Sequence, residues 1–271
     1  MLQNLCDTHV HTIFSRHAYS TLEEDVRAAA DAGLELLGVA DHFSAMIAPC
    51  GDFRAHQHFG NEAVWPRRWH GVTLLRAAEV DIMDLSGRLF GQGETAWGLD
   101  GNPLEGSDFF GFCLRSCDYL VASVHGRRLP DTATLAQGTA LYVAALENPK
   151  VLTLGHIGRA GVPFEVETVV RAAKELHKLI EVNEHSLELA ASPFFSDDIP
   201  ALCRTIAERC AEEGVPIAVN TDAHISYDVG KAPHALAMLE EIHFPQELVA
   251  TRSAAAFLEA VEQGVGPVEG L

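Results

Sequence analysis

Histidines and carboxylates that can bind metal recur at short spacings along this 271-residue chain. The motif His9-Val-His11 follows a short apolar run, and Asp222-Ala-His224 repeats the arrangement near the other end of the sequence. Two residues apart in an extended segment, the side chains of each motif face the same side at a separation of about 6–7 Å. Two ligands at that spacing can grip one ion. The sequence therefore predicts metal chemistry built from both ends of the chain.

Nine metal-capable side chains follow predicted strands. They are His9, His11, His17, His42, Glu79, His125, His156, Asp222 and His224. One histidine at a strand end is usually a hydrogen-bonded core or rim residue, but nine such groups in phase need a further explanation, because buried titratable groups require partners or metals. Since a tetrahedral ion takes about four ligands, the set suits two or three ions that share a bridging carboxylate. Imidazole mixed with carboxylate favours Zn, Mn or Fe.

Short apolar runs alternate with longer amphipathic stretches, a pattern typical of buried parallel strands joined by helices. The predicted strands cover residues 5–10, 37–40, 72–80, 119–124, 151–154, 179–182 and 216–219. The predicted helices cover residues 21–32, 132–147, 166–178, 199–213, 232–242 and 252–263. Repeated strand–helix units indicate an α/β fold with right-handed crossovers. About seven strands in this length favour a closed barrel, whose active site lies at the C-terminal ends of the strands.

The chain has enough apolar material for one core, since 48% of its residues are hydrophobic. We therefore expect residues 1–271 to form a single domain. Two stretches interrupt the alternation. Residues 43–71 are loop-like and rich in aromatics and histidine, and the glycine-rich stretch 84–117 is predicted to be an insertion, either a hairpin or an irregular excursion. Both follow strands, so both are expected on one rim of the barrel. Residues 264–271 are predicted to be a tail.

The charge of the chain argues against some partners. With 19 Lys+Arg and 38 Asp+Glu, the formal net charge is −19, which repels phosphate backbones and disfavours nucleic acid. No stretch approaches the roughly 20 apolar residues of a membrane span. The N-terminal segment lacks the basic and apolar regions of a signal peptide. We therefore expect a cytoplasmic protein without a membrane partner, and the sequence leaves its oligomeric state open.

The motifs resemble those of the PHP (polymerase and histidinol phosphatase) family, most closely its single-domain YcdX-type members. The resemblance rests on CDTHVHTIFSRHAYST, VADH, the strand ending at Glu79, SVH, GHIG and NTDAH, and it spans residues 6–245. It implies that residues 1–271 are one PHP-like catalytic domain with a distorted (β/α)7 TIM-like barrel, a trinuclear metal site and phosphoesterase activity. The implied substrate is a small anionic phosphomonoester, attacked by a metal-bridging hydroxide.

The resemblance also implies how the nine ligands divide among three divalent ions. The first ion would be held by His9, His11, Glu79 and Asp222. The second would share Glu79 and use His125 and His156, and the third would be held by His17, His42 and His224.

Other residues near the predicted ligands are candidates for supporting roles. Four arginines could bind phosphate through forked hydrogen bonds, or form ordinary rim salt bridges: Arg16, Arg127, Arg128 and Arg159. Asn183 and His185 follow the sixth strand and are candidates for contact with substrate or water. Asp41 is a candidate for orienting a ligand histidine rather than for acid catalysis.

Three other functions fit part of the sequence. Phosphodiesterase or nuclease-type PHP activity uses the same chemistry, but the chain lacks a basic groove. An amidohydrolase-like hydrolase would account for the HxH motif and the late aspartate, but not for His17, His42 and Glu79 together. A non-catalytic, metal-binding regulatory protein would retain the ligands without turning over a substrate.

Overall fold

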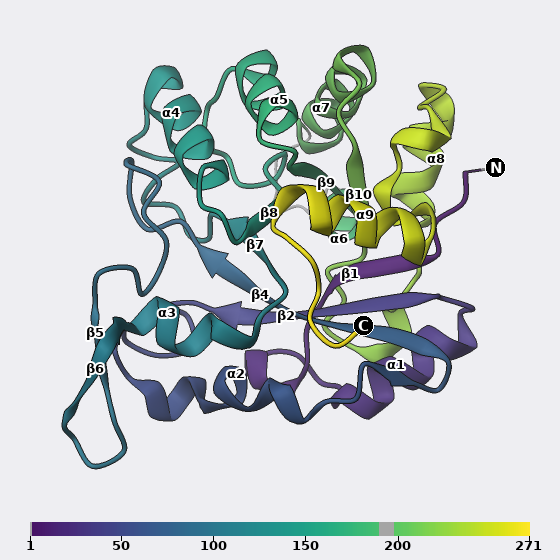
Figure 1. The fold of residues 1–271 in the computed structure, drawn as a ribbon. Coiled ribbons are helices and arrows are strands. Elements are labelled where there is room, and N and C mark those ends of the chain that lie inside the picture. Colours follow the sequence, from purple (N-terminus) through teal and green to yellow (C-terminus); the bar gives the residue numbers. More distant parts are fainter. Residues whose placement is uncertain (1, 190–197) are drawn as a thin grey trace.

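Seven parallel strands dominate the computed structural model, which describes residues 2–189 and 198–271 (Figure 1). Their order in the sheet follows their order in the chain. They are β1 (Cys6–Val10), β2 (Leu36–Phe43), β4 (Val72–Asp81), β7 (Tyr119–Ser123), β8 (Val151–Leu154), β9 (Leu179–Asn183) and β10 (Ile217–Asn220). The seven strands correspond to the seven predicted from the sequence.

The sheet closes almost completely where β10 returns to β1. Just beyond β10, the Asp222 N–H donates to the His9 carbonyl at 2.9 Å. Closer to the strand starts, a side chain rather than the backbone joins β10 to β1. Asn220 Oδ1 accepts hydrogen bonds from the Thr8 N–H at 2.8 Å and from Thr8 Oγ1 at 2.7 Å. The predicted distorted (β/α)7 TIM-like barrel is confirmed, and its distortion includes a seam bridged by side chains.

Helices surround the barrel, with α4, α5, α7 and α8 along one side and α1 and α2 on the other (Figure 1). The long helices are α1 (Leu22–Asp31), α4 (Leu135–Leu146), α5 (Val166–Glu175), α7 (Ile199–Glu213), α8 (Pro233–Glu241) and α9 (Ala254–Gly264). The short ones are α2 (Gln57–Asn61), α3 (Phe109–Cys113) and α6 (Glu184–Leu189). The predicted helix over residues 132–147 begins later, at Leu135, because Thr134 caps it in a capping box with Gln137.

The two interruptions differ in structure. The stretch 84–117 contains an antiparallel hairpin of β5 (Thr95–Trp97) and β6 (Pro103–Asp108), which projects from the barrel in Figure 1. The stretch 43–71, predicted to be a loop, instead contains α2 and a two-residue strand, β3 (Arg68–Trp69), antiparallel to β4. The loop prediction was wrong there because Phe59 of α2 is buried in the core and β3 pairs with the start of β4, contacts that a local hydrophobic pattern does not reveal.

Apolar packing closes the N-terminal end of the barrel. Residues near the strand starts, including Leu36, Tyr119 and Leu179, pack with Phe257 and Val261 of α9, which crosses in front of the strands in Figure 1. In the segment that follows α9, Val265 and Val268 pack against the same cluster.

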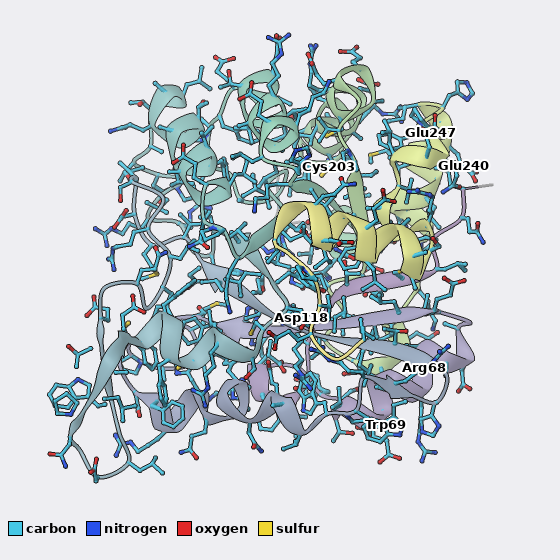
Figure 2. All side chains as sticks on the ribbon, in the orientation of Figure 1. Arg68, Trp69, Asp118, Cys203, Glu240 and Glu247 are labelled. Carbon is cyan, nitrogen blue, oxygen red and sulfur yellow. The ribbon has the colours of Figure 1, made fainter. Side chains whose placement is uncertain are left out.

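Polar anchoring at this end comes from two residues of the β7 region. Tyr119 crosses the barrel and donates to the Thr8 carbonyl at 2.6 Å. Its ring fits only because residue 38 is glycine, since a Cβ there would lie 1.9 Å from the hydroxyl. Asp118, labelled in Figure 2, accepts from both Nη atoms of Arg67 at 2.6 and 2.8 Å and from the Arg76 N–H. These contacts tie the segment before β3 and the middle of β4 to the start of β7.

Within the described ranges, no helix combines the length and the apolar character that crossing a membrane requires.

Candidate metal centre

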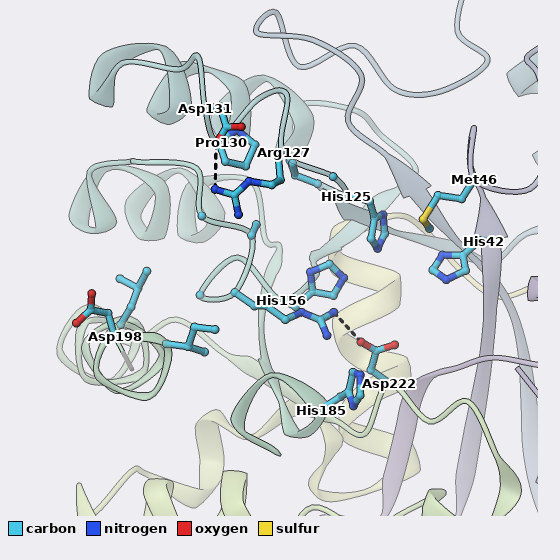
Figure 3. Close-up of a pocket in the computed structure, with 18 of the residues that line it drawn as sticks. His42, Met46, His125, Arg127, Pro130, Asp131, His156, His185, Asp198 and Asp222 are labelled. Carbon is cyan, nitrogen blue, oxygen red and sulfur yellow. Dashed lines mark hydrogen bonds and ion pairs between the residues drawn. The ribbon is translucent and has the colours of Figure 1, made fainter. Parts of the chain in front are cut away.

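All nine predicted ligands lie at the C-terminal end of the barrel. Each comes from the last residues of a strand or from the loop that follows it, as expected for parallel strands whose ends meet on one rim. Figure 3 shows His42, His125, His156 and Asp222 directed into one pocket. Residues more than 200 positions apart in the chain, such as His17 and His224, are thereby brought into contact.

The first group of side chains surrounds Glu79 Oε2. His9 Nε2 lies 3.2 Å from His11 Nε2, and both nitrogens lie 3.5 Å from Glu79 Oε2. His11 Nε2 also lies 3.1 Å from Asp222 Oδ1. Ligand atoms bound to one tetrahedral ion at about 2.0–2.1 Å lie about 3.3 Å from one another. The spacing of this group therefore fits a shared ion.

The second group meets the other oxygen of the same carboxylate. His156 Nε2 lies 2.7 Å from Glu79 Oε1, and His125 Nε2 lies 3.4 Å from it. His42 Nδ1 also lies 2.8 Å from Glu79 Oε2, so each of the two carboxylate oxygens faces a different set of imidazoles. That is the geometry of a bridging ligand.

The third group consists of imidazoles. His17 Nε2 lies 3.3 Å from His42 Nε2 and 2.9 Å from His224 Nε2. The groups are not isolated, because metal-capable atoms of His11, His42 and His224 also lie within 4.8 Å of one another. The nine side chains form one continuous cluster.

The surroundings of one carboxylate oxygen, Glu79 Oε2, indicate whether these side chains fit a bound metal ion. Glu79 is fully buried. His42 Nδ1 lies 2.8 Å from its Oε2, but this oxygen accepts no hydrogen bond of suitable geometry from any residue that the structure describes. A buried carboxylate oxygen without a hydrogen bond is costly. A divalent cation would satisfy it, so the residues present fit bound metal.

The nitrogens that face away from the cluster have partners that fix their tautomers. His9 Nδ1 lies 2.8 Å from Glu181 Oε1, and His125 Nδ1 lies 2.7 Å from Asp81 Oδ1. His224 Nδ1 lies 2.9 Å from the Asp222 carbonyl. Because these oxygens accept hydrogen bonds, they keep the proton on Nδ1 and leave the Nε2 lone pair free for a ligand bond.

Glu181 and Asp81 were not predicted from the sequence as site residues. Their signal is a carboxylate inside an otherwise apolar strand: Glu181 stands in LIEV, and Asp81 follows Glu79 by two residues on the same face of β4. The spacing alone does not say which histidine each one contacts.

The electrostatics of the cluster divide the histidines into two kinds. Burial lowers the pKa of four of them and keeps them neutral, as ligands must be: His11, His17, His156 and His224. Burial also opposes protonation of His125, yet Glu79 and Asp81 raise its pKa to about 10. Burial likewise opposes protonation of His9, but Glu181, Glu79 and Asp222 raise its pKa well above the usual value. These two must release a proton when metal binds.

Two predicted ligands occupy backbone conformations that are rare outside glycine. His156 has φ +33° and Asp222 has φ +58°. Hydrogen bonds hold both: the His156 N–H donates to Glu181 Oε2 at 2.8 Å, and the Asp222 N–H donates to the His9 carbonyl. Strained backbone of this kind is concentrated at functional sites.

A cavity of about 1100 Å³ opens beside the cluster (Figure 3). Six of the predicted ligands line it, together with Arg127, Arg159 and His185. The Arg159 Nη2 lies 3.1 Å from Asp222 Oδ2, so its guanidinium is held against a predicted ligand. Arg127 is exposed and pairs with Asp131 at 3.3 Å on the far wall.

Not every supporting residue falls where the sequence suggested. Arg16 and Arg128 are exposed and do not line the cavity, since a position next to a ligand in the sequence does not fix where a loop side chain lies. Asn183 is buried, and its Nδ2 faces Asp222 Oδ2 at 3.3 Å rather than the cavity.

Asp41 makes no hydrogen bond to a ligand ring and acts through Ser15. It accepts from Ser15 Oγ at 2.6 Å and from Thr12. Ser15 Oγ in turn lies 3.1 Å from His11 Nδ1 and accepts from the His42 N–H. Asp41 therefore holds the serine that contacts two ligands.

A barrel with imidazoles and carboxylates gathered at its strand ends is the architecture of a metal-dependent hydrolase. No family model matches the chain. The chain is 36% identical to a probable phosphatase of Acetivibrio thermocellus over 257 residues, which cover 95% of each sequence. It is also 36% identical to a probable phosphatase of Caldanaerobacter subterraneus, over 93% of this chain and 89% of that one. The chain belongs to this family of bacterial probable phosphatases.

Solved structures share the fold at low sequence identity. A histidinol phosphate phosphatase from Lactococcus lactis, complexed with zinc, L-histidinol and phosphate, superposes with a TM-score of 0.55 at 15% identity, over 90% of this chain and 95% of that one. An Aspergillus niger ochratoxinase gives a TM-score of 0.52 at 16% identity, over 98% and 72%. These similarities show a common barrel and no more.

Proposed function

We propose that the chain is a PHP-type phosphatase, close to the YcdX type, that hydrolyses a small phosphomonoester with the help of three divalent ions of the Zn, Mn or Fe class. The observation that carries the proposal is the position of Glu79. Its two oxygens face two groups of imidazoles, and the buried Oε2 accepts no hydrogen bond from the described residues, although His42 Nδ1 lies 2.8 Å from it. Mixed nitrogen and oxygen donors suit these metals.

The proposed ligand sets follow the three groups of side chains. His9, His11, Glu79 and Asp222 would hold one ion, Glu79 with His125 and His156 a second, and His17, His42 and His224 a third. When bound, such ions lower the pKa of water and offset charge on phosphoryl oxygens. We also propose that residues 1–271 act as one catalytic domain.

Arg159 is the side chain best placed to bind the phosphate of a substrate. Its guanidinium lines the cavity while one nitrogen is anchored on Asp222, so its remaining donors can fork onto a phosphate oxygen. Arg127 and His185, whose ring centroid lies 6.1 Å from that of His224, also line the cavity and would contact the rest of the substrate.

The cavity supports a small-molecule substrate. Its volume of about 1100 Å³ lies just above the roughly 300–1,000 Å³ of typical ligand pockets. Apolar side chains such as Val124, Ile199 and Leu202 share its lining with the polar groups. The net charge of −19 opposes a nucleic acid as the substrate.

Metal content and phosphate release, measured on one sample purified without chelator, test the proposal. We expect two to three equivalents of Zn, Mn or Fe, hydrolysis of an aryl phosphate, and loss of both after chelation. Less than one equivalent that reconstitution does not restore would overturn it. Hydrolysis of a phosphodiester, an amide or a lactone without phosphatase activity would favour the alternative hydrolases, and a metal-loaded but inert protein would favour a regulatory role.

A further inference from the structure

We propose that Glu181, which lies outside the ligand set, is a positioning residue that controls two of the three proposed metal positions at once. It would do so by fixing the tautomer of His9 and the backbone of His156. This inference rests on the proposed metal binding.

Four donors converge on the two oxygens of Glu181. Oε1 faces His9 Nδ1 at 2.8 Å and Asn220 Nδ2 at 2.9 Å. Oε2 accepts from the His156 N–H at 2.8 Å and faces Asn183 Nδ2 at 3.1 Å. Glu181 stands in the middle of β9 and is only 5% exposed. The carboxylate is therefore saturated by protein donors and has no free oxygen for a ligand.

Three of the four donors cannot reverse their roles. The His156 backbone N–H can only donate. Asn183 Oδ1 already accepts from the N–H and hydroxyl of Ser186 at 2.8 and 2.6 Å, which leaves its NH2 group facing Glu181. Asn220 Oδ1 likewise accepts from the N–H and hydroxyl of Thr8 across the barrel seam. Only His9 can change, by moving its proton from one ring nitrogen to the other.

This asymmetry makes Glu181→Gln a directed perturbation. With the amide NH2 turned towards His156 and Asn183, two donor pairs would clash. With it turned towards His9 and Asn220, only one pair clashes, provided that His9 Nδ1 becomes an acceptor. The neutral His9 ring must then carry its proton on Nε2, the nitrogen that faces His11 Nε2 at 3.2 Å and Glu79 Oε2 at 3.5 Å. The first ion would lose a ligand.

The second metal position is affected through the backbone. The hydrogen bond to Glu181 stabilises the backbone of His156 at φ +33°. The preceding residue, Gly155, lies in a tight part of the same turn, where a Cβ would be 2.4 Å from Ser123 Oγ. An amide oxygen at residue 181 accepts this hydrogen bond less strongly than a carboxylate does. The Glu181→Gln change therefore weakens the turn that directs His156 Nε2 towards Glu79. The described contacts of Glu181 reach neither His17 nor His42 nor His224, so the third position serves as an internal reference.

Asp81→Asn is the matched control. Asp81 lies outside the ligand set in the same way, but it contacts one ligand ring, that of His125, and otherwise accepts from Ser44 Oγ. Both variants exchange a buried carboxylate for an amide of the same size. They differ in how many proposed ions the carboxylate supports.

The experiment is a competition titration of chelator-stripped protein with Zn²⁺, resolved into stepwise affinities, for the wild type and both variants. We expect Glu181→Gln to weaken two steps by about 10–100-fold each and Asp81→Asn to weaken one. In zinc-loaded protein labelled with ¹⁵N-histidine, we expect the His9 Nε2 signal of the Glu181→Gln variant to lose its metal-bound shift.

Wild-type affinities in Glu181→Gln, or a loss confined to one step, would overturn the inference. If that variant does not fold, Glu181→Asp keeps the charge and withdraws the oxygens by one methylene, and it is expected to weaken the same two steps. Wild-type behaviour of Glu181→Asp would then be the contrary result. If the wild-type protein itself binds no zinc, the proposed function is wrong. This outcome differs from one in which the wild type binds zinc and only the role of Glu181 is wrong.

Discussion

The two ends of the barrel use the same strands for opposite purposes. Along β4, Leu74 and Leu75 near the start are buried in apolar clusters, whereas Glu79 near the end is buried among imidazoles. The N-terminal end is closed by α9, with Phe257 packed edge-on against Tyr119 at 5.5 Å between ring centroids. The C-terminal end opens into the cavity.

The difference shows where stability and chemistry reside. Burying apolar side chains stabilises the fold at about 25 cal/mol per Å², so the N-terminal end holds the strands together. Burying carboxylates and imidazoles costs free energy unless partners or ions satisfy them. The C-terminal end can bear that cost because the other end has already fixed the strands. Substitutions at the two ends should therefore separate activity from stability.

The largest effect is expected from Asp222→Asn at the C-terminal end. The change removes a proposed ligand charge and weakens the anchor of Arg159, which lies 3.1 Å from Asp222. We expect kcat/KM for an aryl phosphate to fall by at least about 10³-fold, or about 4 kcal/mol of transition-state stabilisation. Metal-free melting temperatures should change little. Activity within tenfold of the wild type would place Asp222 outside the catalytic machinery.

The converse substitution is Phe257→Ala at the N-terminal end. Phe257 is fully buried, so its truncation should cost about 3–5 kcal/mol in the free energy of unfolding, measured by urea denaturation. Well below the melting temperature, kcat/KM should match the wild type. A folded but inactive variant would show that the two ends are coupled.

Metal removal should destabilise the C-terminal end without a substitution. Ions that bind only the folded chain add about 2.7 kcal/mol when present at 100 times their Kd. Chelation should therefore lower the melting temperature by about 5–10 °C, and Zn²⁺ or Mn²⁺ should restore it. The same midpoint with and without chelator would argue against bound metal in the folded protein.

A smaller effect is expected in the pH dependence of stability. It rests on the different pKa shifts of two buried carboxyl groups. The imidazoles around Glu79 hold its pKa well below the usual range despite burial. Asp25 on α1 accepts no hydrogen bond from the described residues, and burial raises its pKa to about 8. Because this folded-state pKa exceeds the unfolded value, the Asp25 contribution to stability is full below about pH 4 and is lost as pH rises towards 8.

Asp25→Asn removes that titration. Between pH 7 and pH 8, we expect the variant to gain about 1 kcal/mol in the free energy of unfolding relative to the wild type, since one proton per pH unit corresponds to about 1.4 kcal/mol. Urea denaturation at both pH values measures the difference. Parallel pH profiles would show that the Asp25 carboxyl already has the same pKa in the folded and unfolded chains.

The sequence by itself determined the alternation of strands and helices and the set of metal-capable residues at the strand ends. Both are local patterns: apolar runs give the strands, and His9, His42, Glu79 and Asp222 stand where those runs stop. The tertiary structure decided which atoms meet. Glu181 is 172 residues from His9, and Arg16 does not line the cavity although the adjacent His17 does. Such contacts depend on barrel closure and on side-chain direction across strands, which residue spacing does not encode.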